Sequence, residues 1–142
     1  MNFHYIRLTP NNKQLIVHTT KSGKMEKINF TITTKTPFGI ETYEGNKYIN
    51  WEINDEMIDL LELVEQNFTD ELKKNYSTYG SWNLRTAIRG KEGYEKLLRT
   101  RMINDLNVEP NVEYDVTIEL ESIWLHRKNK MFGILWHSVS IS

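Results

Sequence analysis

The stretch YDVTIELESIWLHRKNKMFGILWHSVSI, residues 114–141, decides the fold. From Tyr114 to Leu120 apolar and polar residues alternate, which is typical of a strand with one buried face. Near Ser122 the alternation changes phase, which predicts a β-bulge at that position. HRKNK then forms a short basic turn, and MFGILWHSVSI forms a closing strand that is apolar on both faces. The chain is therefore expected to end in an antiparallel hairpin.

Earlier segments also have strand character. Residues 3–8 and 13–20 flank a turn or bulge signal at 10–12, and residues 25–34 alternate with period two. KYINWEI, residues 47–53, resumes the alternation and places Trp51 on the core face. Residues 36–46 contain proline and two glycines and are predicted to form a loop.

The connection of residues 54–111 has helical periodicity. Asn54 is a plausible N-cap for a first helix. Its apolar residues recur at helical spacing: Met57, Leu60, Leu61, Val64 and Phe68. A second helical pattern follows Gly93, with Tyr94, Leu97, Leu98, Met102 and Leu106.

The order of strand, strand, strand, helices, strand, strand predicts a mainly β protein with a helical insertion, an α+β class. We expect one domain over residues 1–142, built as a five-stranded, OB-fold-like Greek-key barrel with two helices between strands 3 and 4. OB-folds bind ligands across strands 2 and 3, between the loops that join strands 1–2 and 4–5. Both loops are basic here and contain Lys21, Lys24, Arg127, Lys128 and Lys130.

Composition limits the class of protein. The chain has 142 residues, 39% hydrophobic content, no cysteine and a formal net charge of −1. A disulfide framework and thiolate metal sites are therefore excluded. Residues 41–72 are strongly acidic, whereas residues 84–101 carry an excess of Lys and Arg. Such asymmetry is typical of a basic contact surface beside a solvated acidic one.

The N-terminus lacks a basic start followed by a sustained apolar run, so no signal peptide is predicted. No segment reaches the roughly 20 apolar residues of a membrane-spanning helix. An intracellular, soluble protein without a membrane partner is expected.

Residues 75–90, NYSTYGSWNLRTAIRG, combine rings with arginines. Tyr76, Tyr79 and Trp82 are spaced by three, and Arg85 and Arg89 follow. Exposed rings would stack on nucleic-acid bases while the arginines contact phosphates. In the alternative interpretation, the rings fold back over the end of the barrel and anchor the long connection.

Two further positions are candidates for nucleic-acid contact. Tyr48 lies on the outer face of the predicted strands 2 and 3, and Arg99 lies on the predicted second helix. The alternative for Arg99 is a solvated helix face with a Glu95–Arg99 pair. Trp124 and Trp136 are assigned to the core or an interface.

Catalytic and cofactor-binding patterns are missing from the sequence. The four histidines have no metal-ligand spacing, and there is no Walker A loop, dinucleotide fingerprint or nucleophile elbow. We therefore expect a protein that is not an enzyme and needs no cofactor.

TPFGIETYEGNKYINWEI (residues 36–53) and the hairpin of residues 114–141, with a Trp before its turn and Gly-x-x-Trp after it, resemble the OB-fold single-stranded-DNA-binding proteins of T7-like phages and large DNA viruses. The resemblance covers about half of the chain. It implies single-stranded DNA binding with little sequence preference in viral or phage replication, recombination or repair. Replication proteins and a second copy of the chain are possible partners.

Two features depart from that group: the connection of residues 54–111 is long, and the chain ends without an acidic tail. The acidic helix at 55–65 is a candidate substitute for such a tail. The alternative function is a β-barrel protein-interaction or virion-assembly module, in which the last strand pairs across a dimer. Binding of double-stranded or structured RNA also stays open.

Overall fold

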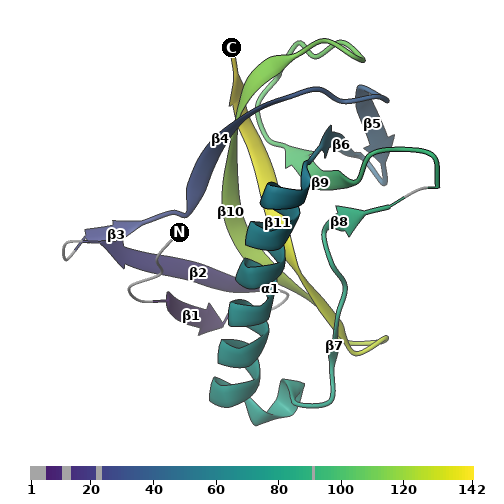
Figure 1. Ribbon diagram of the computed structural model, residues 1–142. Coiled ribbons are helices and arrows are strands. Elements are labelled where there is room, and N and C mark those ends of the chain that lie inside the picture. The colour runs from purple at the N-terminus through teal and green to yellow at the C-terminus, as the bar shows by residue number, and fades with distance from the viewer. Residues whose placement is uncertain (1–5, 11–13, 22–23, 91) are drawn as a thin grey trace.

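The computed structural model describes residues 6–10, 14–21, 24–90 and 92–142. This part of the chain forms a mixed sheet of eleven strands and one α-helix, α1 (Asp55–Asn75), which is followed by a short 3-10 helix, η1 (Ser77–Tyr79) (Figure 1). The predicted α+β class, dominated by β-structure, is confirmed.

The sheet has a continuous path of seven strands with four short strands attached to it. Its order is β1-β2-β10-β11-β9-β6-β5, with β3 on β2, β4 on β10, β7 on β11 and β8 on β9. The strands are β1 (Ile6–Pro10), β2 (Gln14–Lys21), β3 (Lys24–Glu26), β4 (Asn29–Thr34), β5 (Ile40–Tyr43), β6 (Asn46–Glu52), β7 (Asn83–Leu84), β8 (Ile88–Arg89), β9 (Leu97–Met102), β10 (Tyr114–His126) and β11 (Met131–Ile141).

This path is open, so the predicted five-stranded, OB-fold-like barrel is not confirmed. The ends of β4 and β6 nevertheless meet at one corner. The backbone N–H of Glu52 donates to the carbonyl of Lys35 at 2.9 Å, and the Thr34 hydroxyl donates to the carbonyl of Glu52 at 2.6 Å. The strands β4, β10, β11, β9 and β6 therefore curve far enough for the first and last to touch.

The predicted terminal hairpin is the centre of the sheet. Its register moves from Leu120 opposite Trp136 to Ser122 opposite Leu135, which leaves Glu121 as the extra residue and confirms the predicted bulge near Ser122. On either side of the bend, β10 pairs with a different strand. Residues 114–119 pair with β4, and residues 122–124 pair with β2.

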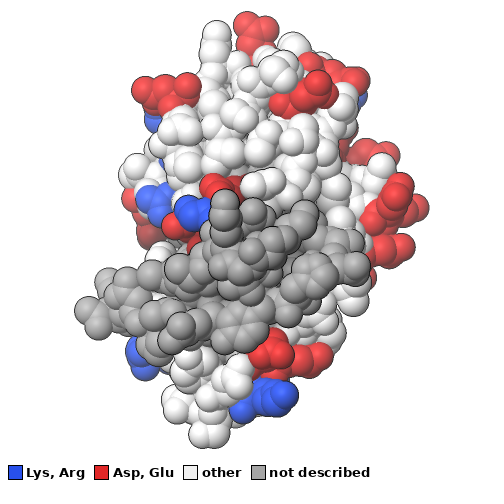
Figure 2. Space-filling model, turned by 90° about the vertical axis from the view of Figure 1, so that its left-hand side faces the viewer, with Lys and Arg blue, Asp and Glu red and all other residues white. Residues whose placement is uncertain are grey.

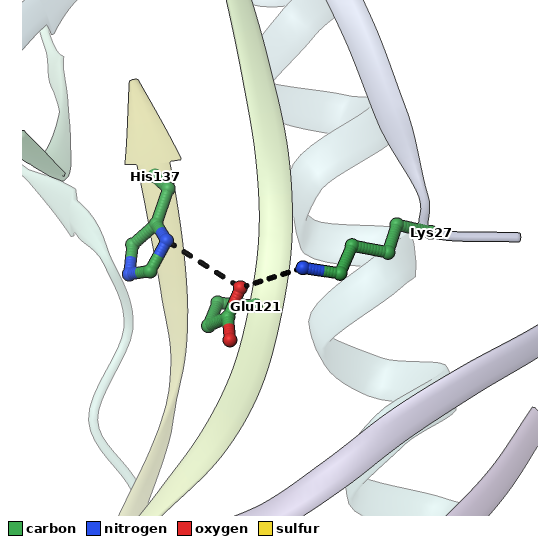
Figure 3. Close-up of polar contacts among 3 residues, drawn as sticks. All are labelled: Lys27, Glu121 and His137. Atoms are coloured by element: carbon green, nitrogen blue, oxygen red, sulfur yellow. Dashed lines mark hydrogen bonds and ion pairs between the residues drawn. The ribbon is translucent and has the colours of Figure 1, made fainter. Parts of the chain in front are cut away.

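Glu121 forms a small ionic cluster at the bulge (Figure 3). One of its carboxylate oxygens lies 3.2 Å from the Lys27 ammonium and 3.5 Å from Nδ1 of His137. Burial lowers the pKa of His137, and the positive charges of Arg101 and Lys27 lower it further, while Glu121 acts in the opposite direction.

The position of β11 explains why this strand is apolar on both faces. It pairs with β10 along one side and with β7 and β9, both parallel, on the other. Helix α1 crosses in front of the β10–β11 hairpin in Figure 1, and buried residues of all three elements belong to one core cluster. Because β11 is not an edge strand, its apolar pattern gives no support to the alternative of pairing across a dimer.

The prediction of a second helix after Gly93 is wrong, because its central part is strand β9. Leu98 and Thr100 are buried while Arg99 and Arg101 are half-buried, which is the alternation of a strand. The strand is held by antiparallel pairing with β6 and β8 and by parallel pairing with β11. Pairing on both sides outweighs the local helical spacing of the sequence.

Helix α1 and the core agree with the sequence. The Asn54 side chain accepts a hydrogen bond from the Met57 N–H at 2.9 Å and caps the helix as predicted. The helix buries one apolar stripe, which includes Leu61, Val64 and Phe68. Trp51 is fully buried as expected, and its indole N–H donates to the Ser138 hydroxyl at 2.8 Å.

Candidate nucleic-acid interface

The pairing of β6 with β9 places polar side chains on one face of the sheet. Tyr48 lies opposite Arg101, and Asn50 lies opposite Arg99. Residues that are directly opposite in an antiparallel pair project to the same face. The residues between them, among them Trp51, are buried on the other face. The alternation of both strands therefore builds a core on one side and a surface of tyrosine and arginine on the other.

This surface is hollowed into a groove with two adjoining parts, of about 640 and 570 Å³. The residues common to both parts are Tyr43, Tyr48, Arg85, Arg89 and Arg99. Arg101 lines the larger part only. We call this feature the arginine groove and define it by these six residues. It runs along β6 and β9 and extends towards β5 and β8, on the right-hand side of Figure 1.

Arg99 is placed against two aromatic rings. Its guanidinium carbon lies 4.1 Å from the ring centre of Tyr48 and 6.0 Å from that of Tyr43. Both distances are within cation–π range, and the contact with Tyr48 is the closer one. Arg101 is fixed beside them, because its guanidinium donates to the Asn46 side chain at 2.6 Å.

A tight hairpin presents Tyr43 to the groove. Residues 40–43 form β5 rather than part of a loop, and Tyr43 pairs with Asn46 across the turn. Both turn residues have positive φ, 49° at Glu44 and 79° at Gly45, as a type I′ turn requires. The side chain of Tyr43 is 59% exposed, so most of its surface is available to a ligand.

More apolar ring surface lies in and beside the smaller part of the groove. Phe38 lines it, and its ring centre lies 6.0 Å from that of Tyr94. Both side chains are exposed. The groove and its margin thus combine aromatic rings with guanidinium groups.

Arg85 and Arg89 come from the segment that contains β7 and β8. This segment is tied to helix α1 through the buried carboxylate of Glu65, which accepts from the Thr86 hydroxyl at 2.7 Å and from the Ala87 N–H at 3.0 Å. Arg89 also donates to the carbonyl of Thr86 at 3.1 Å.

The lining of the arginine groove carries an excess of positive charge. In the described part of the chain, none of its four arginines forms an ion pair. Of the described residues that line the two parts, Glu41 alone has a carboxylate. Burial lowers the pKa of Arg89, and repulsion from Arg85 and Arg99 adds to this effect. An anionic ligand would relieve that repulsion.

Figure 2 shows a different side of the molecule, that of β1–β3, where the described basic side chains occur in small groups among acidic ones.

The far end of the larger part is formed by the terminal hairpin, where Trp124 and His126 line the groove. The Trp124 ring lies directly over Gly133, because a Cβ atom at Gly133 would come within 2.5 Å of it. Trp136 is buried in the core as predicted, whereas Trp124 is only half-buried.

The three rings of residues 76–82 lie elsewhere. Tyr79 and Trp82 are 9% and 6% exposed, pack edge to face with ring centres 4.7 Å apart, and belong to the core. Tyr76 packs against the same cluster. Their placement follows the alternative interpretation, in which these rings anchor the long connection, and leaves Tyr79 and Trp82 almost no surface for a base.

The two predicted basic loops are also separate from the groove lining. Arg127, Lys128 and Lys130 are exposed on the β10–β11 turn, next to His126. The backbones of Lys21 and Lys24 pair in the β2–β3 hairpin, on the opposite side of Figure 1 from β5 and β8. The side chains of Lys21 and Lys24 lie outside the described structure.

Among the predicted contact residues, the structure brings together Tyr48, Arg85, Arg89 and Arg99. Sequence reasoning missed Tyr43, Phe38 and Arg101 as lining residues. The available signal was the alternation of Leu98 and Thr100 with Arg99 and Arg101, which predicts a strand with one basic face.

The described residues contain no group of three or more side chains suited to hold a metal ion, and no helix with the length and apolarity to cross a membrane. Family models, curated proteins and solved structures give no match to this chain. Its function is therefore inferred from the arginine groove.

Proposed function

We propose that the arginine groove binds single-stranded nucleic acid, with DNA as the expected ligand, without strong sequence preference and without catalysis. The observation that carries this proposal is the Arg99 guanidinium, 4.1 Å from the Tyr48 ring, in a groove that it shares with Arg85 and Arg89. A nucleic-acid strand repeats two chemical groups, the base and the phosphate. Aromatic rings can stack on the bases, and arginines without an ion pair in the described chain can bind the phosphates.

Each group has a physical partner in the ligand. Base stacking on an aromatic side chain contributes about 1–3 kcal/mol per base and accepts any base. A guanidinium can form two parallel hydrogen bonds to a phosphate. The exposed ring of Tyr43 needs an unstacked base, which a single strand offers and a duplex does not. These features favour a single strand over a duplex.

A finer fold assignment supports the same function. The contact between the ends of β4 and β6 is consistent with a partly open, OB-like barrel of β4, β6, β9, β10 and β11. In that assignment β6 and β9 are the second and third strands, whose face is the usual ligand site of an OB-fold. Residues 35–45 and 127–130 would flank it, which gives Arg127, Lys128 and Lys130 a peripheral role. The helix would then lie between the second and third strands.

The resemblance of residues 36–53 and of the terminal hairpin to viral and phage proteins favours a role in DNA replication, recombination or repair. A role for α1 follows from its charge, because acidic residues crowd its first turn and stay exposed. In this proposal the acidic helix recruits replication proteins.

Titration of a fluorescein-labelled oligo-dT of about 30 nucleotides, followed by anisotropy, tests the proposal. We expect saturable binding that weakens with salt, with a slope of log K against log[salt] of about −0.7 for each phosphate neutralised. A duplex of the same length should compete poorly. Absence of binding at low salt would contradict the proposal and favour a protein-interaction module.

A further inference from the structure

Glu65 is an unusual residue for the inner face of a helix. It is 4% exposed and shares the buried stripe of α1 with Leu61, Val64 and Phe68. A buried carboxylate costs free energy unless hydrogen bonds satisfy it. Here the donors are the Thr86 hydroxyl and the Ala87 N–H, one to each oxygen. Both of these hydrogen bonds therefore connect the carboxylate to one short segment of the chain.

Sheet pairing holds the two ends of that segment, because β7 pairs with β11 and β8 pairs with β9. β7 and β8 contain two residues each and flank the stretch from Arg85 to Ala87. Arg85 immediately precedes the two residues that Glu65 holds, and Arg89 donates back to the Thr86 carbonyl. The Arg85 N–H donates to the Phe132 carbonyl at 2.8 Å and Arg89 pairs with Leu97, while Glu65 fixes Thr86 and Ala87 between the two arginines.

We infer that Glu65 is a positioning residue that fixes Arg85 and Arg89 beside Arg99, so that the three guanidinium groups form one phosphate subsite in the arginine groove. The inference rests on the proposed function, since the phosphate is that of a nucleic-acid backbone. Three observations carry it: the two hydrogen bonds of Glu65, the presence of all three arginines in both parts of the groove, and the lack of an ion pair to any of them in the described chain.

Electrostatics agrees with this arrangement. Burial lowers the pKa of Arg89, the positive charges of Arg85 and Arg99 lower it further, and the Glu65 carboxylate acts in the opposite direction. A phosphate bound between the guanidinium groups would replace this repulsion with attraction and charge-assisted hydrogen bonds. Preorganised arginines avoid the entropy cost of ordering long side chains on binding.

Three variants and one matched control test the role of Glu65. Glu65→Ala removes both hydrogen bonds, and Glu65→Gln keeps an acceptor for the Ala87 N–H. Thr86→Val removes one of the two hydrogen bonds to Glu65, together with the one that the Ile88 N–H donates to the Thr86 hydroxyl, and leaves the helix unchanged. Thr69→Val is the control, because the Thr69 hydroxyl donates to the backbone carbonyl of Glu65 and not to its carboxylate. Thr86→Val also keeps the test valid if Glu65→Ala fails to fold.

Oligo-dT affinity and its salt dependence separate positioning from general stability. Each lost phosphate contact lowers affinity about fivefold at about 0.1 M salt and reduces the salt slope by about 0.7. We expect Glu65→Ala to lose one or two contacts and Thr86→Val to show a smaller loss in the same direction, while Glu65→Gln and Thr69→Val keep the wild-type slope. A folded Glu65→Ala protein with the wild-type affinity and slope would overturn the inference.

Pyrophosphate distinguishes failure of the subsite from failure of the proposed function. In NMR spectra of the wild type, pyrophosphate should shift the side-chain N–H signals of Arg85, Arg89 and Arg99 together, and Glu65→Ala should weaken this response. If these signals do not move, the subsite is refuted even when oligo-dT binds. If they move and oligo-dT does not bind, the subsite stands and the single-strand function is refuted.

Discussion

Replacing Arg99 with glutamine should weaken nucleic-acid binding without unfolding the protein. The half-buried Arg99 supplies a guanidinium to both parts of the arginine groove and contacts the Tyr48 ring at 4.1 Å. Loss of one phosphate contact lowers oligo-dT affinity about fivefold at about 0.1 M salt and reduces the slope of log K against log[salt] by about 0.7. Loss of the cation–π contact should reduce the free energy of unfolding by about 0.5–1 kcal/mol.

Fluorescence anisotropy at several salt concentrations measures the first effect, and urea unfolding measures the second. Lys74→Gln is the matched control, because it removes one positive charge from the exposed last turn of α1 and not from the groove. We expect this control to keep the wild-type salt slope. If Arg99→Gln and Lys74→Gln change the slope equally, net charge rather than the groove governs binding, and the reasoning is refuted.

Three further predictions concern stability. Gly133→Ala should lower the free energy of unfolding by about 1–3 kcal/mol, because the new methyl group would meet the Trp124 ring at 2.5 Å; urea unfolding that matches the wild type would show that the ring moves freely. The pKa of His137 is lower in the folded protein than in the unfolded chain, where it is about 6.5. The unfolded chain therefore binds a proton more readily, so the contribution of neutral His137 to the stability of the fold is present above about pH 6.5 and is lost as the pH falls further. Urea unfolding at about pH 7.5 and about pH 5.5 should show this loss, which a His137→Gln variant should reduce; equal losses in both proteins would assign the effect to other groups. Asn54→Ala should cost about 1 kcal/mol through loss of the α1 N-cap, and unchanged thermal unfolding would contradict the cap.

Several elements of the fold could be predicted because their residues obey one local rule. The β10–β11 hairpin, the bulge near Ser122 and the Asn54 cap all follow from period, phase change or capping chemistry within a few residues. The core position of Trp51 follows from alternation in the same way. These signals do not depend on which distant segment lies alongside.

Strand β9 could not be assigned by such local rules. Leu97, Leu98 and Met102 fit a helical spacing, and a run of six residues is too short for periodicity to separate helix from strand. What decides its conformation is pairing with β6, β8 and β11, and the residues that pair are far apart in the sequence.

The site was only partly predictable for the same reason. Tyr48 and Arg99 were both candidates, yet they meet only because β6 pairs with β9. Tyr79 and Trp82 satisfied the expected chemistry of a stacking surface, but their burial makes them anchors of the connection. Composition shows which groups can stack or bind phosphate, and packing determines which of them face solvent.

The most direct test of the central claim is photocrosslinking to an oligonucleotide that carries 5-iodouracil, followed by mass spectrometry of the crosslinked peptides. Iodouracil reacts with aromatic rings that stack on it, so this measurement identifies the contact residues themselves. The arginine groove predicts crosslinks at Tyr48 and Tyr43, which Arg99→Gln should weaken at oligonucleotide concentrations below saturation. Crosslinks confined to residues 76–82, or none at a salt concentration where binding is saturated, would contradict it.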